Sequence, residues 1–182
     1  MTRDTFCSCC GTAYEAPLTY PRTCAKCQVS VWSNPIPVSV VLLPVAHALG
    51  EGLLVVRRSI EPKKGLLALT GGFLEDHETW QQGGVREVRE ETLVRIEPST
   101  LSSFWFTSTE PKPNRVLLFS VARGIEASAM PAFVPSSETS ERGLVFGPEG
   151  LEALFAFGLH VEAVRRYFSA RGVTGPARYT EA

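Results

Sequence analysis

The sequence predicts an α/β sandwich preceded by a small cysteine-rich module, and three features of the chain lead to this fold class. Short strand-like runs recur between residues 38 and 122. A long helical pattern covers residues 79–92, and further helical patterns lie near the end of the chain. All five cysteines fall within the first 27 residues. We therefore expect three segments, a module at 1–33, a main domain at 34–172 and a flexible tail at 173–182.

The composition excludes several classes of protein. The formal net charge of the 182 residues is −1, which argues against a nucleic-acid binder that relies on bulk electrostatics. No apolar run approaches the roughly 18 residues that span a bilayer. The first residues also lack the apolar segment of a secretory signal peptide. We therefore expect a cytoplasmic protein that contacts no membrane and for which nucleic acid is an unfavoured partner.

Four of the cysteines form two C-x2-C pairs, Cys7 with Cys10 and Cys24 with Cys27. Two such turns complete a tetrahedral four-thiolate site, which suits structural zinc, and a closed site of this kind supports a fold without doing chemistry. Gly11 follows the first pair and can take the positive φ that such a turn needs. Cys9 is left over. The alternatives are free buried thiols, or disulfides in an exported protein.

The main domain is predicted to begin with a linker at Asn34–Pro37, because its two prolines disfavour helix. Residues 38–43 and 53–58 read as two strands joined in a hairpin, and residues 110–114 read as a proline-rich turn between strands. A loop is expected at 124–143. The remaining predicted strands are 66–70, 103–108, 115–122 and 144–146. Beside the helix at 79–92, helices are predicted at 148–155 and at 159–171.

The helix at 79–92 carries the most informative pattern. Thr79 followed by Gln82 is a capping box, which predicts that the helix begins there. At the helical period, Glu87, Glu90 and Glu91 lie on one face, next to an apolar face that packs on the core. Like charges at these spacings destabilise a helix by a few tenths of a kcal/mol per pair unless a cation binds them.

Carboxylate oxygens are the ligands that Mg²⁺ prefers, with water and phosphate completing its coordination. Arg86 lies one turn before Glu90 and can orient its carboxylate. Gly71 and Gly72 let the backbone approach a ligand closely at a strand end. The alternative is a solvated charged face with an Arg86–Glu90 ion pair.

This segment resembles the signature of the Nudix hydrolases, G-x5-E-x7-R-E-U-x-E-E-x-G-U, where U is aliphatic. Eight of its nine specified positions match, namely Gly72, Glu78, Arg86, Glu87, Val88, Glu90, Glu91 and Val94. Leu93 stands where the signature has the glycine that usually ends the helix in a left-handed turn. His77 also stands where many relatives have glycine. We therefore expect the helix end and the preceding loop to differ from the family pattern.

The resemblance implies a Nudix α/β/α sandwich with a mixed sheet over residues 34–172. It implies hydrolysis of a nucleoside diphosphate linked to another group. By position, Mg²⁺ or Mn²⁺ would be held by Glu87, Glu90, Glu91 and the Gly71 carbonyl, with support from Arg86 and Glu78. A base outside the signature is common in the family. Glu138 and Glu141 are the candidates for that base, and either is equally interpreted as a solvated loop charge.

A zinc ribbon before a Nudix domain also resembles the NADH pyrophosphatases. However, residues 101–108 do not match their S-Q-P-W-P-F-P-x-S stretch, and the coenzyme A signature is absent. The arrangement has a looser resemblance to the ADP-ribose/FAD pyrophosphatase group. Trp105, flanked by Phe104 and Phe106, could stack on a base, or these rings could pack in the core. Arg57, Arg58 and Arg115 could bind phosphate, or they could be exposed solubilising side chains.

The leading hypothesis is a metal-dependent enzyme that cleaves ADP-ribose, FAD or a similar dinucleotide into two monophosphates. The alternatives are a nucleoside triphosphate pyrophosphohydrolase, an NADH pyrophosphatase and a non-catalytic nucleotide sensor. The three intact glutamates favour an enzyme, because a sensor is free to lose them. A homodimer is implied by resemblance only. His47 and His160 have no partner pattern and are expected to be incidental.

Overall fold

The computed structural model describes residues 5–110 and 114–182 and divides the chain into two compact units, Met1–Pro35 and Ile36–Ala182. In the first unit, β1 (Arg22–Thr23) pairs antiparallel with β2 (Ser30–Val31). The other described residues of this unit, from residue 5 onward, form turns and loops with one isolated β-bridge between Phe6 and Ala13. Such a small unit buries little apolar surface, so its stability depends on a staple such as its cysteines.

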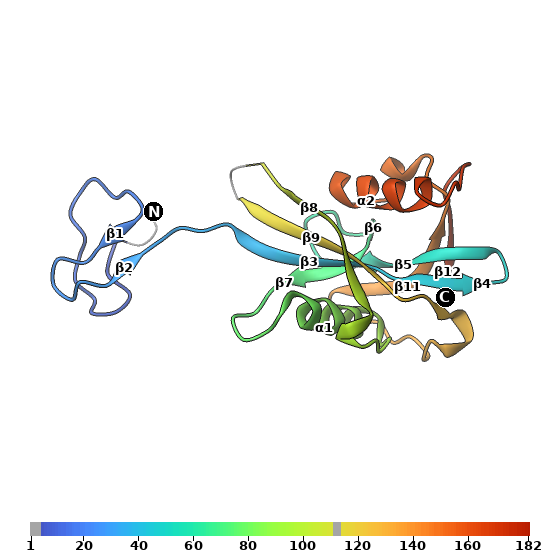
Figure 1. The fold of residues 1–182 in the computed structure, drawn as a ribbon, viewed down its shortest axis with the longest axis horizontal. Helices are drawn as coiled ribbons and strands as arrows, with labels where there is room; N and C mark the ends of the chain where they lie inside the picture. The colour runs from blue at the N-terminus through green and yellow to red at the C-terminus, as the bar shows by residue number, and fades with distance from the viewer. Residues whose placement is uncertain (1–4, 111–113) are drawn as a thin grey trace. The chain divides into compact units, whose positions relative to one another are not determined.

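The second unit contains two β-sheets (Figure 1). One has four strands in the order β7 (Thr70–Phe73), β3 (Ile36–Leu42), β9 (Arg115–Ala122) and β8 (Leu101–Ser108). Its central pair, β3 and β9, is parallel and its outer pairs are antiparallel. The sheet is therefore mixed, as predicted.

The other sheet is built on two long antiparallel strands, β5 (Gly50–Arg58) and β11 (Thr139–Phe146). β6 (Leu67–Ala68) also pairs with β5 and leads almost directly into β7 of the first sheet. The outer strands are β4 (Pro44–His47), β10 (Ile125–Glu126) and β12 (Arg178–Glu181).

Two helices, α1 (Trp80–Thr92) and α2 (Gly158–Ser169), lie on opposite faces of the sheets (Figure 1). Val88 of α1 packs in one apolar cluster, and Val161 and Val164 of α2 pack in another, which confirms the predicted α/β/α sandwich. The described residues of this unit also form three short 3₁₀ turns, η1 (Pro98–Thr100), η2 (Ala127–Ala129) and η3 (Leu151–Ala153). In the described part of the chain, no helix has the length and apolar character to cross a membrane.

The predicted hairpin between residues 38–43 and 53–58 is wrong. β3 ends at Leu42, and the chain then enters the other sheet, where β4 and β5 form the hairpin. Pro44 explains the change of sheet, because it has no N–H to continue the β3 ladder. The predicted helix at 148–155 is also wrong, since only the 3₁₀ turn η3 forms there.

The tail predicted to be flexible from residue 173 instead contains β12, which pairs antiparallel with the outer side of β11. The exposed edge of a long strand favours such pairing, which local periodicity does not reveal. The predicted strand at 144–146 is the end of the longer β11. The proline-rich turn predicted at 110–114 lies largely outside the described residues.

Candidate functional site

Helix α1 begins as predicted and lies unusually close to β3. Thr79 caps it, accepting from the Gln82 N–H while the Gln82 side chain accepts from the Thr79 N–H. A Cβ atom on Gly84 would come within 2.9 Å of Ser39 Oγ on β3. Glycine inside a helix costs about 1 kcal/mol relative to alanine. Here it permits the close approach that brings the carboxylate face of α1 next to β7.

The carboxylate of Glu87 fills the space that a side chain at Gly72 would need. A Cβ atom on Gly72 would overlap the Glu87 carboxylate. Burial raises the pKa of Glu87, and the hydrogen bond from Arg86 opposes that rise. The first glycine of the signature therefore makes room for the first of the three glutamates.

Arg86 organises the cluster by using each of its five N–H bonds. Its Nε and Nη2 donate to the two oxygens of Glu78 at 3.1 and 2.8 Å, and Nη2 also donates to the Phe73 carbonyl at 3.0 Å. Its Nη1 donates to Glu87 at 2.8 Å and to Glu90 at 3.1 Å. Five donors in a rigid fork are thus fully matched. The hydrogen bonds from Arg86 also lower the pKa of Glu78.

Glu91, like Glu87, is partly buried. Its Oε2 accepts a hydrogen bond from the Gly71 N–H at 3.1 Å. Burial raises the pKa of Glu91 to about 8, and the nearby charges of Glu87 and Glu138 act in the same direction. Among the described residues, no side chain makes an ion pair with Glu91, and the charge of Arg58 only partly offsets its burial. The donor set therefore fits a hard divalent ion, whose preferred ligands are carboxylate oxygens.

The three glutamates do not yet converge on one point. Among the described residues, the four cysteines are the one group whose candidate ligand atoms all lie within 4.8 Å of one another. Glu87 and Glu90 are instead turned toward the guanidinium of Arg86. An ion that recruits Glu90, which is exposed, has to compete with this ion pair.

The helix ends as the family signature requires, although glycine is missing. Leu93 adopts φ 65° and ψ −1°, and its N–H donates to the Arg89 carbonyl at 2.8 Å. The expectation that this helix end would differ is therefore wrong for the backbone. A left-handed conformation costs a residue with a side chain roughly 1–2 kcal/mol. Leu93 therefore stores strain beside the carboxylates of Glu90 and Glu91.

The structure separates the two candidate bases. Glu138 lies close enough to Glu87 and Glu91 to raise the pKa of both. Glu141 instead accepts from Arg57 Nε at 2.6 Å and from the Tyr179 hydroxyl at 3.2 Å, and the hydrogen bond from Arg57 lowers its pKa. Glu138 therefore belongs to the cluster, and Glu141 belongs to a cross-strand ion pair between β5 and β11.

The candidate phosphate-binding arginines differ in the same way. Arg57 is held by Glu141 and by the Gly65 carbonyl at 2.9 Å. Arg58 donates to the Pro62 carbonyl at 3.1 Å, and its charge acts on Glu91, where it lowers the pKa. Arg115 lies over the exposed ring of Phe73, 5.5 Å from its centroid. Of the three, Arg58 has the clearest electrostatic link to the carboxylates.

The ring of Trp105 is already packed against other side chains and is not free to stack on a nucleotide base. Its ring is stacked on Phe119 at 5.0 Å, and the Arg166 guanidinium lies 4.2 Å from its centroid. Trp105 also lies on β8, at the opposite edge of the sheet from β7, where the carboxylate cluster packs. Three strand spacings of about 4.8 Å separate these edges. The structure does not bring Trp105 together with the glutamates.

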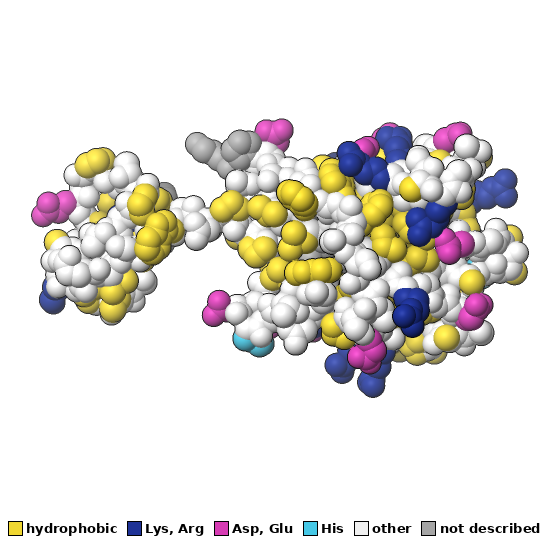
Figure 2. All heavy atoms as spheres, in the orientation of Figure 1, with side chains coloured by type: hydrophobic (Ala, Val, Ile, Leu, Met, Phe, Trp, Pro, Cys, Tyr) yellow, Lys and Arg dark blue, Asp and Glu magenta, His cyan; other side chains and the backbone are white. Residues whose placement is uncertain are grey.

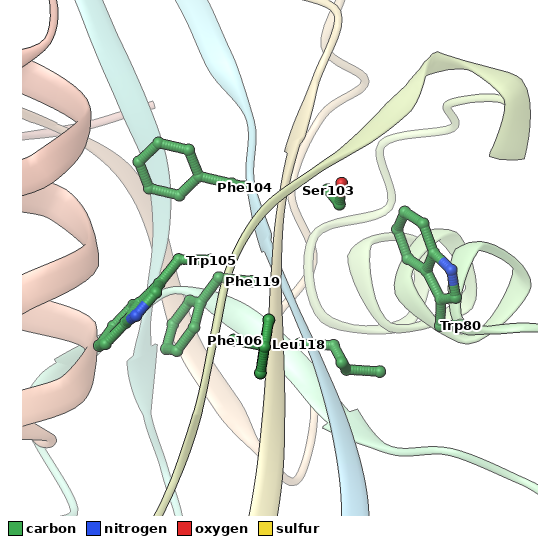
Figure 3. Close-up of a pocket in the computed structure, with 7 residues that line it drawn as sticks. All are labelled: Trp80, Ser103, Phe104, Trp105, Phe106, Leu118 and Phe119. Carbon is green, nitrogen blue, oxygen red and sulfur yellow. The ribbon is translucent and has the colours of Figure 1, made fainter.

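An apolar groove of about 420 Å³ follows β8. Figure 2 shows apolar side chains gathered over β8 and β9. In Figure 3, Phe104, Trp105 and Phe119 lie on one side of β8 and Trp80 lies on the other. Phe106, which also lines the groove, is 75% exposed. The three consecutive aromatics are thus divided between partly buried rings and one surface ring.

His160, which the sequence indicated as incidental, has a specific partner. Its Nδ1 accepts a hydrogen bond from the Leu69 N–H at 3.1 Å, and its side chain is buried. Leu69 lies between β6 and β7, two residues before Gly71. A buried N–H without a partner costs about 1–3 kcal/mol. His160 therefore completes the backbone bonding of the segment that presents Gly71, a contact 91 residues away in sequence.

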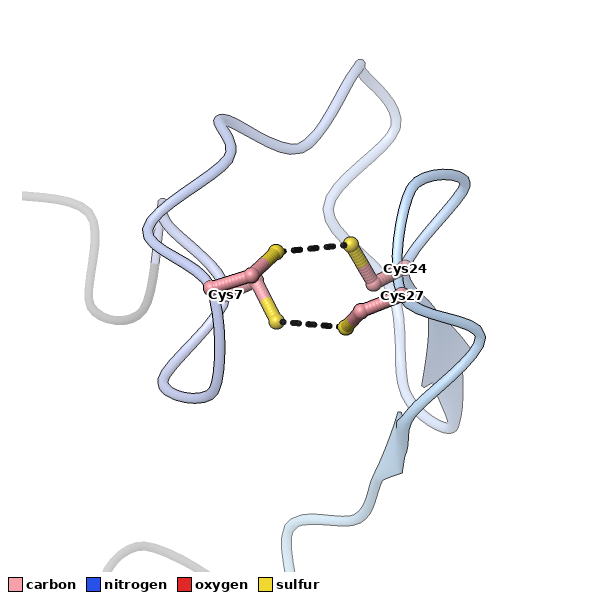
Figure 4. Close-up of side chains that lie close together, drawn as sticks. Cys7, Cys24 and Cys27 are labelled. Atoms are coloured by element: carbon pink, nitrogen blue, oxygen red, sulfur yellow. Dashed lines mark hydrogen bonds between the residues drawn. The ribbon is translucent and has the colours of Figure 1, made fainter.

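The four paired cysteines come together as predicted. The sulfur atoms of Cys7 and Cys27 lie 3.6 Å apart, and so do those of Cys10 and Cys24. Figure 4 shows the two turns facing each other across these atoms. Four sulfurs placed about 2.3 Å from a zinc ion lie about 3.8 Å from one another. The group therefore fits a tetrahedral ion, while Cys9 is exposed and outside it.

The two turns share one backbone pattern. The Cys7 N–H donates to Thr12 O and its carbonyl accepts from Gly11, and Cys24 makes the equivalent bonds at the same spacings. Gly11 has φ +70° as predicted, and the corresponding Gln28 has φ +60°. Backbone N–H groups, that of Cys10 first, lower the pKa of Cys7 to about 6. These amides favour the thiolate, which is the form that binds metal.

Comparisons with known proteins agree with this fold. A family model described as the NUDIX domain matches residues 35–158. The chain is similar to a NUDIX hydrolase from Nitrosomonas europaea, with 26% identity, a TM-score of 0.69 and 92% of each chain covered. It also resembles the NUDIX domain of Shewanella oneidensis NrtR complexed with ADP ribose, with 17% identity, a TM-score of 0.62, and 77% and 90% of the two chains covered.

A third similar structure is an Ap4A hydrolase from C. elegans, with 14% identity, a TM-score of 0.57, and 75% and 98% of the two chains covered. The last two likenesses concern the fold alone. The family model, in contrast, covers more than half of the chain and includes the carboxylate cluster. The chain therefore belongs to the Nudix family.

Proposed function

We propose that the chain hydrolyses the diphosphate of a nucleoside diphosphate linked to another group, such as ADP-ribose or FAD, into two monophosphates. The observation that carries this proposal is the Arg86-centred cluster, in which one guanidinium holds Glu78, Glu87 and Glu90 beside the partly buried Glu91. Structural similarity to a NUDIX domain complexed with ADP ribose supports the choice of substrate class.

Within this proposal, Glu87, Glu90, Glu91 and the Gly71 carbonyl would hold Mg²⁺ or Mn²⁺. The bound ions would neutralise diphosphate oxygens and lower the pKa of an attacking water. Arg86 orients two of the carboxylates, and the Gly71 N–H orients the third. Glu138 is the favoured base, because it lies near the cluster and makes no ion pair among the described residues.

The test of the reaction is a substrate panel. Purified full-length chain with Mg²⁺ or Mn²⁺ is incubated with ADP-ribose, FAD, NADH, Ap4A and nucleoside triphosphates, and products are separated by chromatography. We expect AMP from ADP-ribose or FAD. Preferential release of pyrophosphate from a triphosphate, or cleavage of NADH alone, would replace the proposed substrate class. Nucleotide binding without turnover would indicate a sensor.

The test of the cluster is Glu90→Gln, with Glu97→Gln as the matched control. Glu97 is an exposed residue beyond the end of α1. We expect Glu90→Gln to reduce kcat by at least about 100-fold, as losses of transition-state electrostatics do, and Glu97→Gln to retain the wild-type kcat. Undiminished hydrolysis by Glu90→Gln would refute the catalytic role assigned to Glu90. Glu138→Gln should lower kcat with little change in KM if Glu138 is the base.

For the first unit, we propose that Cys7, Cys10, Cys24 and Cys27 hold one structural Zn²⁺. The mutual sulfur distances and the two matching turns support this assignment. Elemental analysis of the purified chain should find about one zinc per chain, as a closed four-thiolate site requires. A fully stable chain purified without zinc would refute it.

A further inference from the structure

The last turn of α1 carries two of the three glutamates and ends at a strained residue. A helix end leaves its last carbonyls without helical partners. Two of these carbonyls are bound by side chains of β11. Thr139 Oγ1 donates to the Glu91 carbonyl at 3.2 Å, and Arg142 Nη1 donates to the Thr92 carbonyl at 2.9 Å.

Thr139 is only 2% exposed, and its hydroxyl is held from a second side. Ser136 Oγ lies 3.0 Å from Thr139 Oγ1 and also accepts from the Thr139 N–H at 3.1 Å. A hydroxyl can donate one hydrogen bond and accept others. Ser136 can therefore donate to Thr139 while Thr139 donates to the main chain of Glu91.

Arg142 is a buried cation whose hydrogen bonds, among the described residues, all go to main-chain oxygens, and its guanidinium also lies 5.6 Å from the ring centroid of Phe133. Arg142 is 3% exposed, and its other donors reach Pro131 O and Ala182 O, each at 2.9 Å. No acidic side chain in residues 5–110 or 114–182 lies within ion-pair distance of it. The C-terminal end of a helix carries partial negative charge. The end of α1 therefore offers Arg142 both a carbonyl and a favourable field.

We infer that Thr139 and Arg142 are positioning residues that hold the metal-binding end of α1 against β11. These two hydrogen bonds, which we call the clamp, offset the strain at Leu93, where the family signature has glycine. Because Glu138 directly precedes Thr139, the same bond also sets the distance from Glu138 to Glu91. The clamp is inferred for the proposed metal site. It rests on the proposed function only in the identity of the reaction that this site catalyses.

Metal affinity is the first readout, because it requires no substrate. Mn²⁺ binding to the full chain is titrated by electron paramagnetic resonance for Thr139→Val and for the matched Thr139→Ser, which keeps the hydroxyl. Losing a partner that orients a metal ligand typically weakens binding by about 10–100-fold. We expect about tenfold weaker Mn²⁺ binding for Thr139→Val, and binding within about twofold of wild type for Thr139→Ser.

Turnover is the second readout. At saturating metal, Thr139→Val and Arg142→Lys should lower kcat for ADP-ribose while KM changes little, because both side chains are buried, at 2% and 3% exposure. Ser136→Ala, at an exposed residue, should weaken Mn²⁺ binding in the same direction but less, and it keeps the inference testable if Thr139→Val fails to fold. Wild-type Mn²⁺ affinity in folded Thr139→Val or in Ser136→Ala overturns the inference. Weakened Mn²⁺ binding in Thr139→Val, in a chain whose wild type hydrolyses no dinucleotide, supports the clamp and refutes only the proposed substrate.

Discussion

The carboxylate of Glu87 occupies the space that a Cβ atom on Gly72 would need. Gly72→Ala must therefore displace Glu87 from its position beside Arg86. We expect kcat to fall by about 10–100-fold, the range for disturbed metal ligands, with little loss of thermal stability. Gly158→Ala is the matched control, because a Cβ atom there would have no neighbour within 4 Å. Equal activity of the two variants would show that Glu87 is free to relocate.

Replacing Arg86 with lysine should reduce both activity and stability. The five N–H bonds of Arg86 meet five acceptors, whereas an ammonium offers three donors from a single atom. We expect Arg86→Lys to lose at least about tenfold in kcat and about 1–3 kcal/mol in the free energy of unfolding, because acceptors are left unpaired. The control is Arg89→Lys, at an exposed position on the same helix. Kinetics and urea denaturation measure both effects.

Leu93→Gly should stabilise the chain. Relief of the left-handed strain is worth roughly 1–2 kcal/mol, and the added freedom of glycine in the unfolded chain offsets about 0.4–1 kcal/mol of it. A net gain of about 0.5–1 kcal/mol is expected in urea denaturation. Leu49→Gly is the contrasting control, at an exposed leucine outside the left-handed region, and it should not stabilise. A loss of stability in Leu93→Gly would mean that the Leu93 side chain contributes more than its backbone costs.

The paired cysteines and the unpaired one should respond differently to substitution. Cys24→Ser removes one of four converging ligands and should abolish zinc retention and unfold residues 5–35, because such small units depend on their metal. Cys9→Ser should retain about one zinc per chain, since Cys9 is exposed and outside the group. Elemental analysis and hydrogen exchange report the two outcomes. Full zinc retention in Cys24→Ser would refute the four-cysteine site.

Local patterns explain which features were predictable. The Thr79–Gln82 capping box, the carboxylate face of α1 and the positive φ of Gly11 all depend on neighbours within a few residues, and each was predicted. The pairing of β12 with β11 depends instead on contacts across the fold, as does the choice of the sheet that the chain enters after Pro44 ends the β3 ladder. Neither leaves a periodic signal.

The residues of the candidate site also differ in whether local sequence patterns predict their positions. The signature residues meet because they lie on one helix and the adjoining strand, whereas Glu138 is distinguished from Glu141 only by the register of β11 against β5. The left-handed end of α1 persists at Leu93, held by Thr139 and Arg142 from about 50 residues further along the chain. Partners at such separations cannot be read from spacing alone.

The contact between His160 and Leu69 should make stability depend on pH. Burial, together with the charge of Arg58, lowers the pKa of His160 to about 3, against about 6.5 in an unfolded chain. Between these values the unfolded state binds a proton that the folded state does not, so stability is lost as the pH falls below about 6.5.

From pH 7 to pH 5 the wild-type chain should lose about 2 kcal/mol relative to His160→Gln, at about 1.4 kcal/mol per pH unit below 6.5. Glutamine can still accept from the Leu69 N–H but does not titrate, and His77→Gln, at an exposed histidine, should keep the wild-type slope. Urea denaturation at several pH values measures the difference. Parallel pH profiles for wild type and His160→Gln would show that His160 is protonated in the folded chain, in which case a water or a rearranged backbone must satisfy Leu69 instead.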